Sequence, residues 1–202
     1  DRPSTGDETD PGELEVAVMG HHTFDPSSAH SLEGLDRFRY LSRDELVGAL
    51  ELPETATVAD VGSGTGFYTR EVAPYVGTVY AVDLQDEMHD AFSDREIPPN
   101  VELVLAPAAS LPFDDGQLDG LYSTMTFHEV SEAAPAEFAR VLRPDGSLVI
   151  VDWSAAGEGA RGPPTTERHD VAEASERLEA AGFDVTLARE RPETFFLEAT
   201  CR

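Results

Sequence analysis

Short apolar runs alternate with amphipathic segments over most of the chain. The runs predict buried β-strands at 56–62, 77–84, 100–106, 118–125 and 146–153. The segments between and after them predict helices at 65–76, 86–94, 129–142 and 171–182, the third of which is interrupted or begins near Pro135. Apolar strands that alternate with helices are typical of an α/β fold with a doubly wound, mostly parallel sheet covered on both faces.

The carboxyl-terminal region predicts a hairpin. Residues 183–190 and 193–200 are strand-like runs that only two residues separate. Parallel neighbours cannot be joined by so short a connection, so one of these strands runs antiparallel. Gly182, just before the hairpin, is the expected cap of the preceding helix. The segment 155–166 is rich in glycine and proline and predicts a mobile loop.

The amino-terminal region predicts a tail followed by one domain. Residues 1–20 are polar and acidic and contain glycine and proline, which is typical of a disordered tail. Met19 is a candidate initiator, and the residues before it are either an extension of the gene model or a native tail. We expect residues 21–202 to form a single domain.

The first part of that domain, residues 21–52, predicts a helical lid. Residues 26–39 form a short helical stretch, and Ser42 with Glu45 predicts a capping box before a helix over 43–52. Three aromatic residues here either cover a ligand or pack on the sheet: Phe24, Phe38 and Tyr40.

Composition excludes several classes of protein. Hydrophobic residues make up 40% of the 202 residues, enough for a globular core. No apolar run approaches the ~20 residues of a membrane helix. The first twenty residues lack the basic start and apolar stretch of a signal peptide. A single cysteine, Cys201, rules out a disulfide framework and a cysteine-based zinc site, so we expect a cytoplasmic protein.

The charge balance is strongly acidic. The formal net charge is −26, and all fourteen basic side chains are arginine. Such a field repels nucleic acid and anionic lipid, so neither is an expected partner. The acids are spread along the chain, which favours a surface adapted to molar salt and a halophilic source. The alternative is attraction of a cationic ligand.

The segment 58–69, VADVGSGTGFYT, carries the strongest chemical signal. A strand ends, three glycines follow at Gly62, Gly64 and Gly66, and a helix begins, so backbone N–H groups face a bound ligand. Asp83 ends the next strand, where a carboxylate accepts hydrogen bonds from ribose hydroxyls or caps the next helix. Asp60 either holds the loop or receives the ammonium group of a bound amino acid.

Four segments together resemble class I S-adenosylmethionine (SAM)-dependent methyltransferases of the type-11 branch, which includes ubiquinone and menaquinone biosynthesis enzymes. They are VADVGSGTGFYT, VYAVDLQDEM, LPFDDGQLDGLYSTMTFHEV and RVLRPDGSLVIVDW. The chain is also similar to small prokaryotic methyltransferases with an FDP start, an FHE segment and a DW…GPP loop. Here these fall at 24–26, 127–129 and 152–164.

The resemblance implies a Rossmann-like, seven-stranded sheet of order 3-2-1-4-5-7-6 with strand 7 antiparallel. It implies SAM as the cofactor. Many relatives bond the adenine amino group with an aspartate after the third strand, but residues 106–109 here contain no acid, so the backbone makes that contact or it is lost. The implied cofactor-binding residues are Asp60, Gly62, Ser63, Gly64, Gly66, Asp83, Leu84, Met88 and Thr124.

Candidate catalytic residues follow the fourth strand, at the rim where such sheets bind ligands. His128 and Glu129 are candidate bases for a protonated acceptor, with backbone bonding and helix initiation as their structural alternatives. Asp152 and Trp153 end the fifth strand on the same rim, and Trp153 either walls the substrate pocket or joins the core. His21, His22 and His30 lack an acid at ligand spacing, so no metal site is expected.

We therefore expect an enzyme that transfers a methyl group from SAM to a small-molecule acceptor. Two alternatives stay open: a non-catalytic SAM-binding protein, and an NAD-dependent oxidoreductase on a related fold. Phe67 stands where a dinucleotide loop needs glycine or alanine, which counts against the second. Quinone methylation remains possible. Arsenite methylation is disfavoured, because that chemistry uses several thiols.

Overall fold

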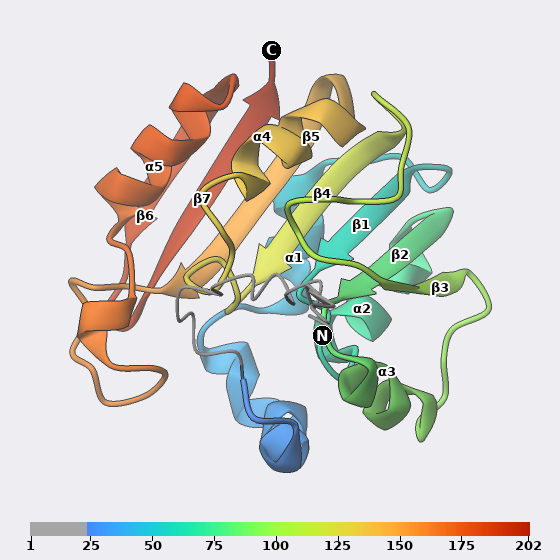
Figure 1. The fold of residues 1–202 in the computed structure, drawn as a ribbon, viewed down its shortest axis with the longest axis horizontal. Helices are drawn as coiled ribbons and strands as arrows, with labels where there is room; N and C mark the ends of the chain where they lie inside the picture. Colours follow the sequence, from blue (N-terminus) through green and yellow to red (C-terminus); the bar gives the residue numbers. More distant parts are fainter. Residues whose placement is uncertain (1–23) are drawn as a thin grey trace, which may run out of the picture.

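A seven-stranded sheet forms the centre of the computed structural model, which describes residues 24–202 (Figure 1). The strand order is β3-β2-β1-β4-β5-β7-β6, with β7 antiparallel to both of its neighbours, as predicted. The strands are β1 (Thr57–Val61), β2 (Thr78–Asp83), β3 (Val101–Leu105), β4 (Leu118–Thr124), β5 (Leu142–Trp153), β6 (Phe183–Glu190) and β7 (Thr194–Cys201).

Helices cover both faces of this sheet. In Figure 1, α4 and α5 lie in front of the strands, while α1 and α2 lie behind them. α3 follows β2 and packs near that strand. The helices are α1 (Arg43–Leu50), α2 (Phe67–Val72), α3 (Asp86–Ser93), α4 (Ala134–Val141) and α5 (Val171–Ala180).

Alternating side chains of the central strands fill two cores. In β1, Val58 packs in the cluster with α1 and α2, whereas Ala59 and Val61 pack in the cluster with α4 and α5. The same period of two assigns the polar residues at the strand ends to a face. Asp60 therefore points toward α2, and Asp152 in β5 points toward the α4 side.

Several element boundaries differ from the sequence prediction. The helix expected at 129–142 is α4, which begins at Ala134, next to Pro135. The helix expected at 65–76 is α2 followed by a 3₁₀ turn at Ala73–Tyr75, where proline removes a backbone donor. The strand expected at 146–153 begins at Leu142, because Leu142 pairs with Leu118 before a register shift in the ladder.

The predicted helix caps are found in part. The Ser42 hydroxyl accepts the Glu45 N–H at 3.2 Å, but the Glu45 carboxylate binds Arg191 at 2.5 Å, so the reciprocal half of the capping box is replaced. The cap residue of α5 is Ala181, and Gly182 follows it with a φ of 101°. The expected position of that cap was thus wrong by one residue.

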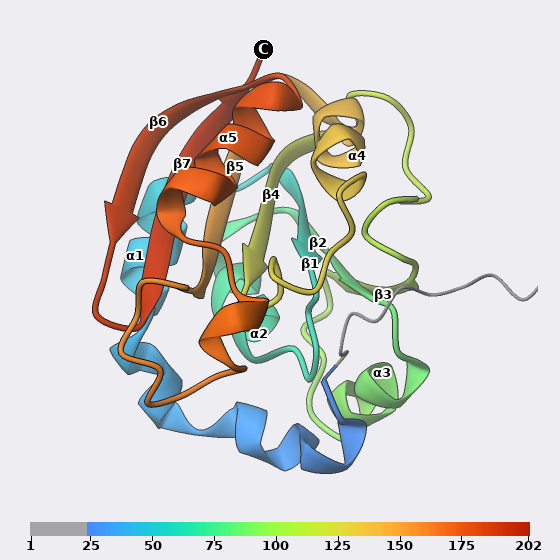
Figure 2. The same ribbon diagram turned by 60° about the vertical axis from the view of Figure 1, so that its left-hand side comes forward.

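Residues 24–40, here called the lid segment, lie across the carboxyl ends of the strands (Figure 2). They form two 3₁₀ helices, Pro26–Glu33 and Leu35–Arg39. α1 instead packs on the sheet through Leu46 and Leu50. The predicted tail, Met19, His21 and His22 lie outside the described residues.

Candidate functional site

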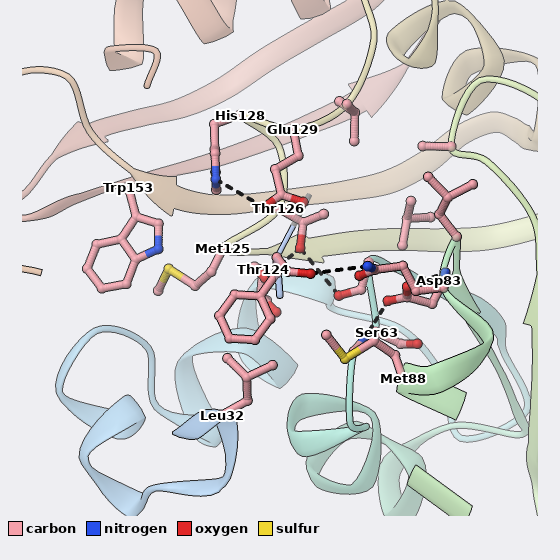
Figure 3. Close-up of a pocket in the computed structure, with 18 of the residues that line it drawn as sticks. Leu32, Ser63, Asp83, Met88, Thr124, Met125, Thr126, His128, Glu129 and Trp153 are labelled. Atoms are coloured by element: carbon pink, nitrogen blue, oxygen red, sulfur yellow. Dashed lines mark hydrogen bonds and ion pairs between the residues drawn. The ribbon is translucent and has the colours of Figure 1, made fainter. Parts of the chain in front are cut away.

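A cavity of about 900 Å³ lies at the carboxyl ends of the parallel strands, beneath the lid segment. Its wall also includes the glycine loop, the turn after β2, the loop after β4 and part of the 155–166 loop. Figure 3 shows Asp83 and Met88 toward one end, and His128 and Trp153 toward the other. Ligands of doubly wound sheets bind at this edge, so the cavity is the candidate site.

The glycine loop, residues 62–66, is anchored to β2. The Val82 carbonyl accepts the N–H groups of Gly62 and Ser63 at 2.9 and 3.0 Å. Gly62 and Gly66 have φ values of 79° and 76°, which other residues rarely adopt. The anchored loop turns the chain sharply from β1 into α2.

Members of this loop face different surroundings. A Cβ on Gly66 would lie 2.2 Å from the Phe92 ring of α3, so Gly66 serves close packing and does not line the cavity. Gly64 and Ser63 do line it. The buried Ser63 hydroxyl has no hydrogen-bond partner among residues 24–202, which leaves a polar atom for a ligand.

Asp83 lies at the carboxyl end of β2 in the cavity wall. Its carboxylate accepts the N–H groups of Gly64 at 2.8 Å and Gln85 at 3.0 Å. Burial raises the pKa of Asp83, and these hydrogen bonds oppose part of the rise. A carboxylate accepts about four hydrogen bonds, so it retains capacity for two ribose hydroxyls. Leu84 and Met88 line the wall beside it.

Asp60 does not reach the cavity. It is 1% exposed, and its Oδ2 accepts a hydrogen bond from the Thr69 hydroxyl of α2 at 2.6 Å. Burial raises the pKa of Asp60 to about 7. Two roles were predicted for Asp60, holding the loop and receiving an ammonium group. The geometry matches the first, because Asp60 ties β1 to α2 next to the loop.

Arg37 is a cavity residue that the sequence analysis missed. Its guanidinium lies 5.2 Å from the ring centroids of both Phe67 and Tyr68, and it donates to the Leu32 carbonyl at 3.0 Å. Burial lowers the pKa of Arg37. It forms no ion pair with a carboxylate in the described part of the chain. A cation in this position suits an anionic group of a ligand.

The lid segment is fastened to the glycine loop and to both neighbouring helices. Glu33 pairs with Arg70 of α2 at 2.6 Å and with Arg95 after α3 at 3.3 Å, and it accepts the Thr65 hydroxyl of the loop. At the start of the segment, the Phe24 carbonyl accepts the Gln85 amide at 3.1 Å. The lid is therefore closed over the cavity in this structure.

His128 and Glu129 line the cavity at the end away from Asp83. They follow β4 at the carboxyl edge of the sheet, where the sequence analysis expected them. Figure 3 shows His128 and Glu129 next to each other, with His128 on the side of Trp153. His128 Nδ1 is 2.9 Å from Asp152 Oδ2, and His128 Nε2 is 3.6 Å from Glu129 Oε1. Burial by itself lowers the pKa of His128, but Asp152 and Glu129 outweigh it and raise that pKa to about 10.

Trp153 lines the cavity and is packed on several sides. Its ring is 5.0 Å from that of Tyr40 in the lid segment and 5.7 Å from the Arg168 guanidinium. A Cβ on Gly162 would lie 2.5 Å from the indole, so the loop backbone presses against it. Of the two places predicted for Trp153, the pocket wall and the core, the structure shows the pocket wall.

The 155–166 loop is held by two charged side chains. The buried Arg168 donates to the carbonyls of Arg161, Pro163 and Ser154. The Glu193 carboxylate accepts the N–H groups of Gly159 and Ala160 at 3.1 and 3.0 Å. These contacts fix the position of the loop, which forms one side of the cavity wall.

Residues 24–202 contain no cluster of histidine, cysteine or carboxylate side chains suited to a metal ion. No helix in this part of the structure has the length and apolar character needed to cross a membrane.

The sheet order and the glycine loop define a Rossmann-like domain with a ligand-sized cavity at the carboxyl ends of its strands. A methyltransferase-domain family model matches residues 59–150. A SAM-dependent methyltransferase from Aquifex aeolicus superposes with a TM-score of 0.80 and 30% identity, covering 89% of this chain and 100% of that one. The chain belongs to the SAM-dependent methyltransferase family, as the sequence resemblance implied.

Two curated relatives share about a third of their aligned residues with this chain. The ubiquinone/menaquinone biosynthesis C-methyltransferase UbiE of Ectopseudomonas mendocina is 34% identical over 50% of this chain and 43% of the relative. The demethylmenaquinone methyltransferase of Mycolicibacterium gilvum is 34% identical over 62% of this chain and 53% of the relative. The chain thus spans about half the length of these proteins.

Proposed function

We propose that the protein transfers the methyl group of SAM to a small-molecule acceptor. The observation that carries this proposal is one continuous cavity, with the glycine loop and Asp83 at one end and His128 and Glu129 at the other. Bound SAM supplies a methyl group already activated by the sulfonium. The protein's part is then to align the acceptor, exclude water and accept a proton.

Residues around the cavity fit the parts of SAM. Asp83 is placed to bind the ribose, Leu84 and Met88 to flank the adenine, and Arg37 to pair with the carboxylate. The Ser63 hydroxyl and the Gly64 backbone face the same space, with Thr124 beside them. Residues 106–109 offer only backbone to the adenine, since they contain no acid. The fit leaves the end near Trp153 for the acceptor.

Calorimetry tests the cofactor assignment. We expect SAM and S-adenosylhomocysteine to bind and NAD not to bind. NAD binding without SAM binding would favour the oxidoreductase. Release of labelled methyl to an acceptor panel then separates an enzyme from a non-catalytic SAM-binding protein. The [4+2]-cyclase SpnF shares this fold, with a TM-score of 0.71 at 20% identity, so the fold by itself does not establish methyl transfer.

Quinone-like rings are one acceptor class supported by the relatives' names. Tyr40, Met125 and Trp153 give this end of the cavity an apolar wall that suits a ring. We further propose a cytoplasmic protein from a halophilic source that binds neither nucleic acid nor membrane, on the basis of its net charge of −26. A filter-binding assay with DNA and with anionic vesicles at low salt tests whether the protein binds nucleic acid or membrane, and we expect no binding to either.

Ligand binding is expected to increase the protection of the lid segment and of the 155–166 loop against hydrogen exchange. Both line the cavity, so a bound ligand adds contacts to segments that are otherwise held by Glu33 and Arg168. Exchange is measured by mass spectrometry with and without S-adenosylhomocysteine, and α5 serves as the internal control. Equal protection of both segments in the two states would remove the gating role.

A further inference from the structure

Asp152 adds a third titratable group to the acceptor end of the cavity. It is 0% exposed and lies one residue before the end of β5. Its carboxylate accepts the backbone N–H groups of His128 at 2.5 Å and Trp153 at 2.7 Å. Both carboxylate oxygens also lie within hydrogen-bond distance of His128 Nδ1, at 3.0 and 2.9 Å.

This geometry determines the orientation of the His128 ring. A carboxylate that accepts backbone N–H groups offers no proton, so Nδ1 carries the hydrogen and donates it to Asp152. Nε2 then faces Glu129 Oε1 at 3.6 Å. A lone pair on Nε2 would be repelled by that carboxylate, whereas an N–H would be attracted. Two acids on opposite sides of one imidazole thus favour its charged form.

Other charged groups near this cluster do not reverse that balance. His169 Nε2 lies 2.7 Å from Arg177 Nη1 and accepts a hydrogen bond from it, so His169 is neutral. Burial and then Arg177 lower the pKa of His169. Glu132 is exposed and lies on the Arg177 side. The exposed Arg161 and Glu167 in the cavity wall are opposite in charge.

We propose that Asp152 is a positioning residue that holds His128 as an imidazolium, which leaves Glu129 to receive the proton of the methyl acceptor. The acceptor half of this statement rests on the proposed function, but the charge state of His128 does not. The site then suits an uncharged acceptor with an O–H or N–H group. In the transfer, the acceptor atom would form a bond to the methyl carbon as the methyl–sulfur bond of SAM breaks and its electron pair returns to sulfur. The O–H or N–H proton would bind a Glu129 oxygen, and the electron pair of that bond would stay on the acceptor atom. Glu129 repels a carboxylate or phosphate acceptor.

The charge state is tested by nuclear magnetic resonance of protein labelled with ¹⁵N in its six histidines. His128→Gln assigns the His128 signals. We expect the wild-type His128 ring to stay protonated from about pH 6 to pH 8, above the ordinary histidine pKa of about 6.5. Asp152→Asn should lower the His128 pKa by about two units or more, and Glu129→Gln by less. The exposed Glu132→Gln is the matched control and should leave it unchanged.

A wild-type His128 that titrates near pH 6.5 overturns the assignment, as does an unchanged His128 pKa in Asp152→Asn. Signals of the other histidines report whether that variant folds, and Glu129→Gln tests the same cluster without touching the buried carboxylate. On an acceptor panel, Glu129→Gln should lower kcat by about 10²–10⁴-fold with little change in KM. Methylation of carboxylic acids alone overturns the acceptor class. Absence of SAM binding in calorimetry overturns the proposed function and leaves the titration result standing.

Discussion

Asp83→Ala is expected to weaken SAM binding by about 100-fold or more. A hydrogen bond to a charged group contributes ~1.5–3 kcal/mol, and two ribose hydroxyls lose such a bond together. Each 1.4 kcal/mol corresponds to about tenfold in affinity. Calorimetry with S-adenosylhomocysteine measures the change without turnover.

Two variants separate ribose binding from loop structure. Asp83 also accepts the Gly64 and Gln85 N–H groups, so its removal frees part of the glycine loop. Asp83→Asn retains a carbonyl oxygen for one of these donors and should weaken binding less than Asp83→Ala. Asp90→Ala removes an exposed acid of α3 and should bind like the wild type. Wild-type affinity in Asp83→Ala would show that this carboxylate does not hold the ligand.

The melting temperature is expected to climb by on the order of 10 °C or more between about 0.1 M and 2 M KCl. The protein carries a net charge of −26, and its bases are fourteen arginines, several already paired with acids. At low salt the Debye length exceeds ~10 Å, so acids across the surface repel each other. Net stability is typically only ~5–15 kcal/mol, so this repulsion is a large fraction of it.

A charge-reduced variant distinguishes repulsion from general salt effects. Five exposed acids without side-chain partners in the described structure are changed to their amides, which takes the net charge from −26 to −21. They are Glu54, Asp90, Asp114, Glu158 and Glu176. This variant should melt higher than the wild type at 0.1 M KCl and respond less to added salt. A flat wild-type melting curve would mean that the acidity serves another purpose, such as attracting a cationic acceptor.

The sequence predicted those parts of the site that depend on local signals. The glycine loop and Asp83 are such parts, because an apolar strand, a glycine turn and an acid at the next strand end are all visible in one stretch. The strand order came from the family resemblance, since alternation alone predicts a parallel sheet without its order. The position of His128 and Glu129 on the rim followed from their place after β4.

Contacts between segments far apart in the chain could not be predicted from local sequence patterns. Nothing local marks Arg37 as a cavity residue, because its partners are the rings of Phe67 and Tyr68 in another element. The hydrogen bond of His128 to Asp152 depends on which face of β5 the acid occupies, which required the observed register. The glycine and proline content of the 155–166 loop predicted mobility. It gave no sign that Arg168 and Glu193 hold the loop backbone by hydrogen bonds.

Arg191, in the turn between β6 and β7, donates to the Tyr40 carbonyl at 2.8 Å and pairs with Glu45 at 2.5 Å. These partners are 151 and 146 residues apart in sequence. Bringing such distant residues together costs loop-closure entropy, so contacts of this kind form slowly. During synthesis, the lid end next to Tyr40 therefore stays unfastened until β6 has been made. β7 follows Arg191 in the chain and joins β6 to β5, so the sheet and this fastening of the lid are completed together.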